Sequence, residues 1–203
     1  VAASPISTSI ASVSESQAFE DEPLPTPASE EAVASGIIAI TSGHGSPGRT
    51  TVAINLAAGL GATSPTLLLD ADFPGPSVAA SLDADPTRNV YMVAHSQPET
   101  GADWTRAFEQ ECQPLGRRSP KSTVLCGIPK PELAGQMSAR FMDRLLTELE
   151  RRYRYVIVDL GAAPGAPAAI QRTILRRAGQ VLFVTSADIV GLWHTRSALA
   201  SWK

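Results

Sequence analysis

A glycine-rich loop between residues 43 and 50 contains the side chains of this sequence that are most suited to chemistry. The segment Gly-His-Gly-Ser-Pro-Gly-Arg-Thr fits the phosphate-binding pattern G-x-x-x-x-G-K-[ST] at every fixed position except the lysine, where Arg49 stands. Glycines let the main chain approach an anion closely, and backbone N–H groups at the start of a helix point toward bound phosphates. The hydroxyl of Thr50 is of the type that binds Mg²⁺ in such loops. The loop therefore predicts a nucleotide phosphate site with Mg²⁺.

Two aspartates follow short apolar segments elsewhere in the chain. Asp72 comes just after the segment 66–69, and Asp159 comes directly after 155–158. Phosphoryl transfer needs charge neutralisation and an oriented nucleophile, and carboxylates beside the phosphate loop can supply both with Mg²⁺. Each aspartate could instead cap a helix or lie in a loop after its strand. Both interpretations stay open from the residues alone.

Short apolar segments alternate with amphipathic ones along the chain, and these elements have to position the loop and the aspartates. Because parallel strands need crossovers that cover the sheet, this alternation predicts an α/β fold with a mainly parallel sheet and helices on both faces. The expected strands are 37–40, 66–69, 123–126, 155–158 and 181–184, and the expected helices are 50–60, 76–82, 104–112, 138–151, 168–177 and a last one from 190 onward. We expect this last helix to continue past residue 203, so that the nucleotide-binding domain is incomplete at its carboxyl-terminal end.

The composition changes sharply at residue 36. Residues 1–35 are rich in Ser, Ala and Pro, and they hold six acidic side chains and no Lys or Arg. Such a segment buries too little apolar surface to offset the entropy of ordering, so we expect a disordered acidic tail or linker. Residues 36–203 form the predicted P-loop domain. This domain has a small positive charge, and arginines concentrated between Arg140 and Arg177 suggest either a solvated helix face or a surface for DNA or anionic lipid.

Other classes of protein find little support in the sequence. Cys112 and Cys126 form neither a CxxC pair nor a disulfide framework, and no segment reaches the ~18 apolar residues of a membrane span. We therefore expect a cytoplasmic protein. The loop also matches the dinucleotide pattern G-x-G-x-x-G, but Arg49 and Thr50 after the glycines and the Asp-Ala-Asp after the second strand favour the phosphate loop.

The sequence resembles the MinD/ParA family of deviant-Walker P-loop ATPases over roughly residues 36–203. The resemblance rests on Gly45-Ser46-Pro47-Gly48-Arg49-Thr50-Thr51, on Asn55-Leu56-Ala57 and on Leu69-Asp70-Ala71-Asp72. Because it lacks the family's lysines and has the Asp-Ala-Asp motif, the sequence most resembles the divergent CpaE/TadZ-like branch, which is associated with pilus assembly and polar placement. The resemblance implies a three-layer P-loop NTPase fold that binds ATP and Mg²⁺ through Gly45 to Thr51.

The resemblance also implies roles for individual side chains. Asp72 would position the attacking water, Arg49 would contact the phosphates, and Thr50 and Asp159 would hold Mg²⁺, Asp159 through water. Two family lysines are replaced, one by Arg49 in the same subunit and one by His44, which would reach across a nucleotide-sandwich dimer. Arginine keeps the charge but is larger and differently hydrated, whereas a histidine of ordinary pKa ~6.5 is mostly neutral at pH 7. We therefore expect nucleotide binding with slow or absent hydrolysis.

Two functions remain open at this stage. The first is a MinD/ParA-like ATP-binding switch, a weak ATPase at most, that positions the pilus machinery, a division site or a chromosome. Its partners would be a second copy in a nucleotide-dependent homodimer and a protein of a localisation or pilus system. It could also contact DNA or a membrane surface. It would be recruited to a cell pole or the inner membrane surface. The second is a non-enzymatic scaffold with a vestigial pocket.

Overall fold

The fold is built on one six-stranded sheet. The computed structural model describes residues 36–44, 48–117, 119–162 and 167–200, and these lie within one structural unit. The strands lie in the order β3-β4-β2-β5-β1-β6, and every neighbouring pair is parallel except β3 and β4. Their bounds are β1 (Gly36–Ser42), β2 (Thr66–Asp70), β3 (Gln113–Pro114), β4 (Ser122–Leu125), β5 (Tyr155–Ala162) and β6 (Gln180–Val184). The expected α/β fold with a mainly parallel sheet is confirmed.

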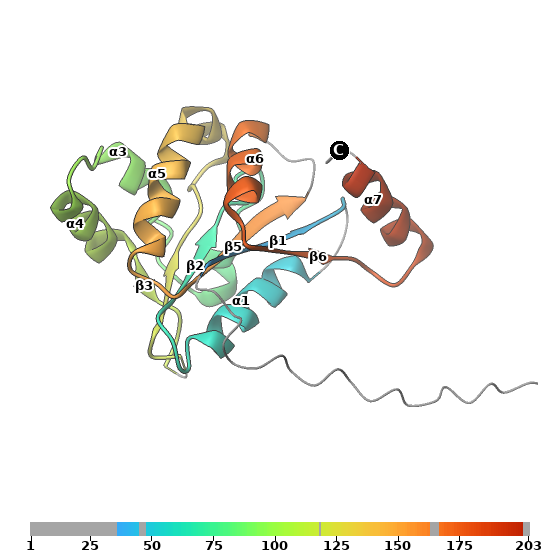
Figure 1. Ribbon diagram of the computed structural model, residues 1–203, viewed down its shortest axis with the longest axis horizontal. Helices are drawn as coiled ribbons and strands as arrows, with labels where there is room; N and C mark the ends of the chain where they lie inside the picture. The colour runs from blue at the N-terminus through green and yellow to red at the C-terminus, as the bar shows by residue number, and fades with distance from the viewer. Residues whose placement is uncertain (1–35, 45–47, 118, 163–166, 201–203) are drawn as a thin grey trace, which may run out of the picture. The chain divides into compact units, whose positions relative to one another are not determined.

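Helices cover both faces of the central strands (Figure 1). They are α1 (Arg49–Leu60), α2 (Val78–Leu82), α3 (Val90–His95), α4 (Gly101–Glu111), the 3₁₀ helix η2 (Pro131–Gln136), α5 (Ala139–Glu150), α6 (Ala168–Arg177) and α7 (Ile189–Ala200). Successive side chains of a strand point to opposite faces. Accordingly, Ile37 and Ala39 of β1 belong to the core beneath α5 and α6, whereas Ile38 and Ile40 pack with α1.

The structure differs from the sequence-based expectation in two places that matter. The short helix α3 was not predicted, and it begins where the Asn89 side chain accepts a hydrogen bond from the Met92 amide at 3.1 Å. Strand β5 does not end before Asp159 but continues to Ala162. Its pairing with β1 shifts after Ile40, and Gly161 takes a φ of 79°, so the strand passes Asp159 through an irregular turn.

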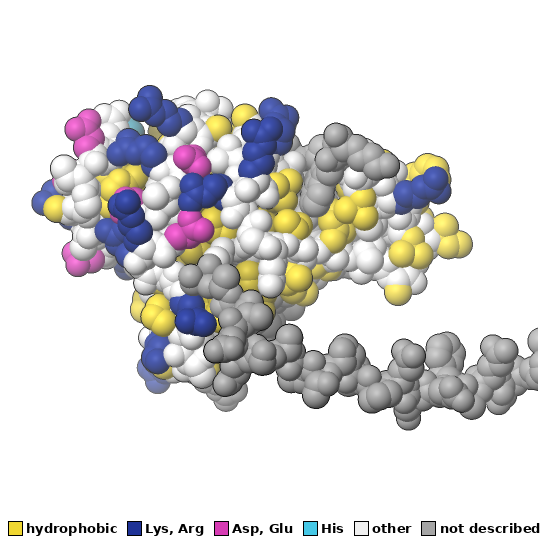
Figure 2. Space-filling model, in the orientation of Figure 1, with side chains coloured by type: hydrophobic (Ala, Val, Ile, Leu, Met, Phe, Trp, Pro, Cys, Tyr) yellow, Lys and Arg dark blue, Asp and Glu magenta, His cyan; other side chains and the backbone are white. Residues whose placement is uncertain are grey.

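Strand β6 and helix α7 carry exposed apolar side chains. Val181 and Leu182 of β6 are each 38% exposed, and hydrophobic atoms gather over this end of the domain in Figure 2. On α7, Ile189, Val190, Leu192 and Trp193 are also exposed. The edge strand β6 is therefore less well covered than the sequence pattern suggests, in contrast to the central strands, which helices cover on both faces.

The arginines of α5 and α6 are partly neutralised by neighbouring acids. Arg177 pairs with Asp143 and Glu150 on α5, and Arg152 pairs with Glu148. Figure 2 shows blue and magenta side chains mixed over this surface. These ion pairs offset part of the positive charge of this region. Among the described helices, no stretch is both long enough and apolar enough to cross a membrane.

Candidate functional site

The site begins where β1 turns into α1. Gly48 precedes the helix with φ 95° and ψ −4°, a left-handed conformation that side-chain-bearing residues rarely adopt. This turn places Arg49 at the first position of α1, beside the carboxyl ends of β1 and β5. Gly45, Ser46 and Pro47 lie outside the described residues, so the predicted anion cradle of the loop stays a prediction.

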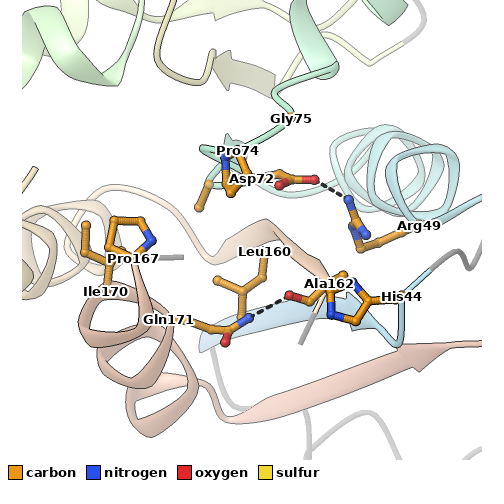
Figure 3. Close-up of a pocket in the computed structure, with 11 residues that line it drawn as sticks. His44, Arg49, Asp72, Pro74, Gly75, Leu160, Ala162, Pro167, Ile170 and Gln171 are labelled. Carbon is orange, nitrogen blue, oxygen red and sulfur yellow. Dashed lines mark hydrogen bonds and ion pairs between the residues drawn. The ribbon is translucent and has the colours of Figure 1, made fainter. Parts of the chain in front are cut away.

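Arg49 connects three elements through its guanidinium group. Its Nε donates to Oδ1 of Asp159 at 2.9 Å, and one terminal nitrogen donates to the Ser42 hydroxyl at 3.0 Å. The other terminal nitrogen pairs with Oδ2 of Asp72, as Figure 3 shows. The Arg49 side chain is only 14% exposed. A largely buried cation therefore bridges the two aspartates that the sequence singled out.

Thr50 completes the surroundings of Asp159. Its hydroxyl donates to Oδ2 of Asp159 at 2.6 Å and lies 3.0 Å from the hydroxyl of Ser77. Asp159 is fully buried in β5, where it pairs in register with Ile40 of β1 and Asp70 of β2. Both of its carboxylate oxygens are thus occupied by partners from α1, which satisfies a charge that would otherwise be costly to bury.

Asp70 shapes the loop that carries Asp72. Its buried carboxylate accepts backbone N–H bonds from Asp72 at 3.1 Å, Ser77 at 3.2 Å and Val78 at 3.1 Å. Burial raises the pKa of Asp70 to about 7, against the backbone hydrogen bonds, which favour the ionised form. The sequence analysis gave Asp70 no role of its own, although its place at the end of a buried strand before a Pro/Gly-rich loop was a usable signal.

Asp72 approaches the main chain of β5 closely. A Cβ atom at Gly161 would lie only 2.6 Å from Oδ1 of Asp72, so the carboxylate sits where a side chain would otherwise be. Burial raises the pKa of Asp72, and the neighbouring Arg49 opposes that rise. Sequence reasoning missed Gly161. Its only signal in the sequence was its position two residues after Asp159.

A cavity of about 330 Å³ opens beside this cluster. Arg49, Asp72 and Gly75 line one part of it. Residues that follow Asp159 in the chain line another part, namely the apolar Leu160, Ala162, Pro167 and Ile170 together with the polar Gln171 (Figure 3). His44 also lines the cavity, and its ring centre lies 6.5 Å from that of His194 on α7.

The structure brings together most of the predicted site residues that it describes. Arg49, Thr50, Asp72 and Asp159 form one hydrogen-bonded cluster, and His44 faces the same cavity. Thr51 does not join them. It is exposed on α1, where its carbonyl accepts a bond from the Asn55 side chain at 2.8 Å.

The oxygen atoms of the cluster fit Mg²⁺ bound together with a nucleotide. Mg²⁺ prefers oxygen ligands, and proteins usually hold it by one or two carboxylates while water and substrate phosphates supply the rest. Thr50, Asp72 and Asp159 are ligands of this kind. The described residues contain no group of three or more His, Cys, Asp or Glu that could bind a metal without such help.

Comparison with solved structures finds this fold in MinD and ParA proteins and in a kinase domain. The septum site-determining protein MinD from Pyrococcus horikoshii, solved with Mg-ADP, matches with a TM-score of 0.63 and 20% identity over 82% of this chain. A ParA family ATPase from Chlorobium tepidum matches with a TM-score of 0.68 and 17% identity over 83% of this chain and 68% of its own. The VpsO kinase domain matches with a TM-score of 0.62 and 19% identity over 83% of this chain and 79% of its own.

These likenesses establish the fold, because the identities are low and a kinase domain shares it. The chain spans 64% of the length of the Pyrococcus MinD that it matches. No protein-family model and no curated protein sequence matches the chain.

Proposed function

We propose that this chain binds ATP with Mg²⁺ and acts as a MinD/ParA-like switch, with slow or absent hydrolysis, that positions a cellular cargo. The observation that carries the proposal is the cluster of Arg49, Thr50, Asp72 and Asp159 at the carboxyl end of the sheet. This is the edge at which open α/β sheets bind their ligands. A strand-to-helix turn with a left-handed glycine leads into the cluster, as a phosphate loop requires.

Each side chain of the cluster has a role in this proposal. Thr50 and Asp159 would hold Mg²⁺, Asp159 through water, and the ion would neutralise phosphate charge. Arg49 would contact the phosphates, and Asp72, on the cavity wall, would orient a water molecule. The loop from Gly45 to Thr51 would bind the phosphates mainly through its amides.

Slow turnover follows from the two basic positions. Arg49 shares its charge with two carboxylates, so less of it is available to stabilise phosphoryl transfer. His44 stands where the family has its second lysine, so the cation that would reach across a homodimer is missing from that position. Losing a cation directed at transition-state charge commonly lowers rates by ~10² or more.

The cargo and partners are inferred from the solved structures. MinD has been solved in complex with MinC in Aquifex aeolicus, and McdA and plasmid partition proteins share the fold. We extend this to a nucleotide-dependent homodimer that recruits a localisation protein for a division site, a chromosome or, as in the CpaE/TadZ-like branch, the pilus machinery. Placement at a pole or the inner membrane surface, and contact with DNA or lipid, belong to the same proposal.

A scaffold with a vestigial pocket is the second candidate, and one observation favours it. Arg49 pairs with both Asp72 and Asp159, so a side chain of the protein itself supplies a partner for each carboxylate. A pocket that had lost its nucleotide would be expected to close its charges in this way.

Calorimetric titration with ATP separates the two functions. The switch predicts saturable binding that requires Mg²⁺, whereas the scaffold predicts none. The control is Arg177→Ala, which removes an ion-paired arginine far along the sequence on α6 and should leave ATP affinity unchanged. Absence of ATP binding at millimolar concentrations, by a folded protein with Mg²⁺ present, would overturn the proposed switch.

A further inference from the structure

The carboxylates that would serve a divalent cation already hold a cation of the protein itself. Arg49 directs three of its donors to Asp159, Ser42 and Asp72, and Thr50 occupies the remaining oxygen of Asp159. The guanidinium therefore lies against the same oxygen atoms that Mg²⁺ would attract. Both cations cannot make these contacts at once.

The charge balance of the cluster favours exchange. One guanidinium faces two carboxylates in a site that is only 0 to 14% exposed at its charged side chains. One positive side chain thus faces two acidic ones, and a third acidic side chain, that of the buried Asp70, pairs in register with Asp159. Such a site attracts a divalent cation and disfavours a free polyphosphate, because charges interact strongly where water is excluded.

We propose that Arg49 is an internal competitor for the divalent cation, and that cation binding at Asp159 releases the guanidinium from Asp159 and Asp72 toward the phosphates. The inference rests on the proposed nucleotide site. Arg49 already lines the cavity, so the released group needs no backbone movement to face a ligand there. Free ATP then meets a locked, negatively charged site, whereas the cation and ATP together meet a cation site and an available arginine.

The first test measures Mg²⁺ binding by calorimetry with no nucleotide present. Replacing the competitor in Arg49→Gln should raise Mg²⁺ affinity about tenfold or more, since a buried positive charge beside the site is removed. The matched control is Arg177→Gln, which also frees two carboxylates, those of Asp143 and Glu150, but on the surface. An unchanged affinity in Arg49→Gln, or an equal rise in the control, would overturn the competition.

The second test uses the unaltered protein and does not depend on whether Arg49→Gln folds. The Nε–H of Arg49 is hydrogen-bonded and shielded, so it should give a protected resonance in ¹⁵N-edited spectra, assigned by its loss in Arg49→Lys. Mg²⁺ should shift this resonance or abolish its protection, while NaCl at equal ionic strength should not. At a free Mg²⁺ concentration about 20 times the dissociation constant measured by calorimetry, about 95% of the sites are occupied. A resonance that is still unchanged at this concentration refutes the release of Arg49.

These results are distinguishable from a failure of the proposed function. If Mg²⁺ displaces Arg49 but the protein binds no ATP, the exchange stands and the switch is wrong. If ATP binds with Mg²⁺ while the Arg49 signal and the Mg²⁺ affinities stay constant, the nucleotide site stands and the exchange is wrong.

Discussion

Replacing Arg49 by methionine should strongly destabilise the protein at neutral pH. The substitution keeps an unbranched, flexible side chain but leaves the carboxylate of Asp159, which is fully buried, and that of Asp72 without their shared cation. Breaking a buried ion pair from one side typically costs about 3–5 kcal/mol of unfolding free energy. We therefore expect a loss in this range, which is a large part of the stability of an ordinary domain.

The size of this loss has a ceiling that depends on pH. A carboxyl without its partner can take up a proton instead of staying charged, so the loss cannot exceed the free energy of this protonation. For an ordinary aspartate pKa of ~3.9, protonation costs about 4 kcal/mol at pH 7 and almost nothing at pH 4. Removing Arg49 also removes an influence that lowers the pKa of Asp72, so that pKa should rise further in the variant. A raised pKa means that stability is lost as pH increases, and the difference between the two proteins should therefore shrink toward about 1 kcal/mol near pH 4.5.

Urea denaturation followed by far-ultraviolet circular dichroism, at several pH values between 4.5 and 7.5, measures both the loss and its pH dependence. The double variant Arg49→Met/Asp159→Asn is the matched control, because it removes the buried charge together with its partner and should recover part of the stability at pH 7. A loss below 1 kcal/mol at pH 7, or one that does not vary with pH, would show that Arg49 does not neutralise the buried carboxylates.

Three further substitutions probe the same site. Gly161→Ala should cost about 1–2 kcal/mol of stability through its left-handed backbone and should displace Asp72, which weakens Mg-ATP binding in calorimetry; an unaltered affinity would argue against a role for that carboxylate. Asp70→Asn should abolish a decrease in stability, of up to roughly 4 kcal/mol between pH 4 and 7, that follows from the folded-state pKa of about 7 against the ordinary 3.8; equal pH slopes in urea denaturation of both proteins would contradict this. Thr50→Val should cost about 1–3 kcal/mol by leaving an oxygen of Asp159 unpaired, and Mg²⁺ should bind more weakly in calorimetry, with Thr50→Ser as the control that retains both properties.

The sequence alone predicted the elements whose patterns are local. Runs such as Ile37 to Ile40 bury both of their faces, and the amphipathic segment 139–150 buries one, so apolar periodicity is enough to identify the strand and the helix. The glycine-rich loop and the two aspartates could be singled out for the same reason, since glycine spacing and a strand-end carboxylate are visible along the chain. Helix α3 escaped because it is six residues long and depends on the cap at Asn89.

Tertiary structure alone decided how the charges of the site are arranged. Asp72 and Asp159 lie 87 positions apart in the sequence, and only the parallel pairing of β2 with β5 brings their ends together. Three contacts depend on where the backbone turns after each strand. Arg49 bridges the two aspartates, Asp70 supports the loop that carries Asp72, and Asp72 lies in the space that a side chain at Gly161 would fill. Residue types and spacing carry no such information, because a contact between distant segments is set by sheet register and burial rather than by local pattern.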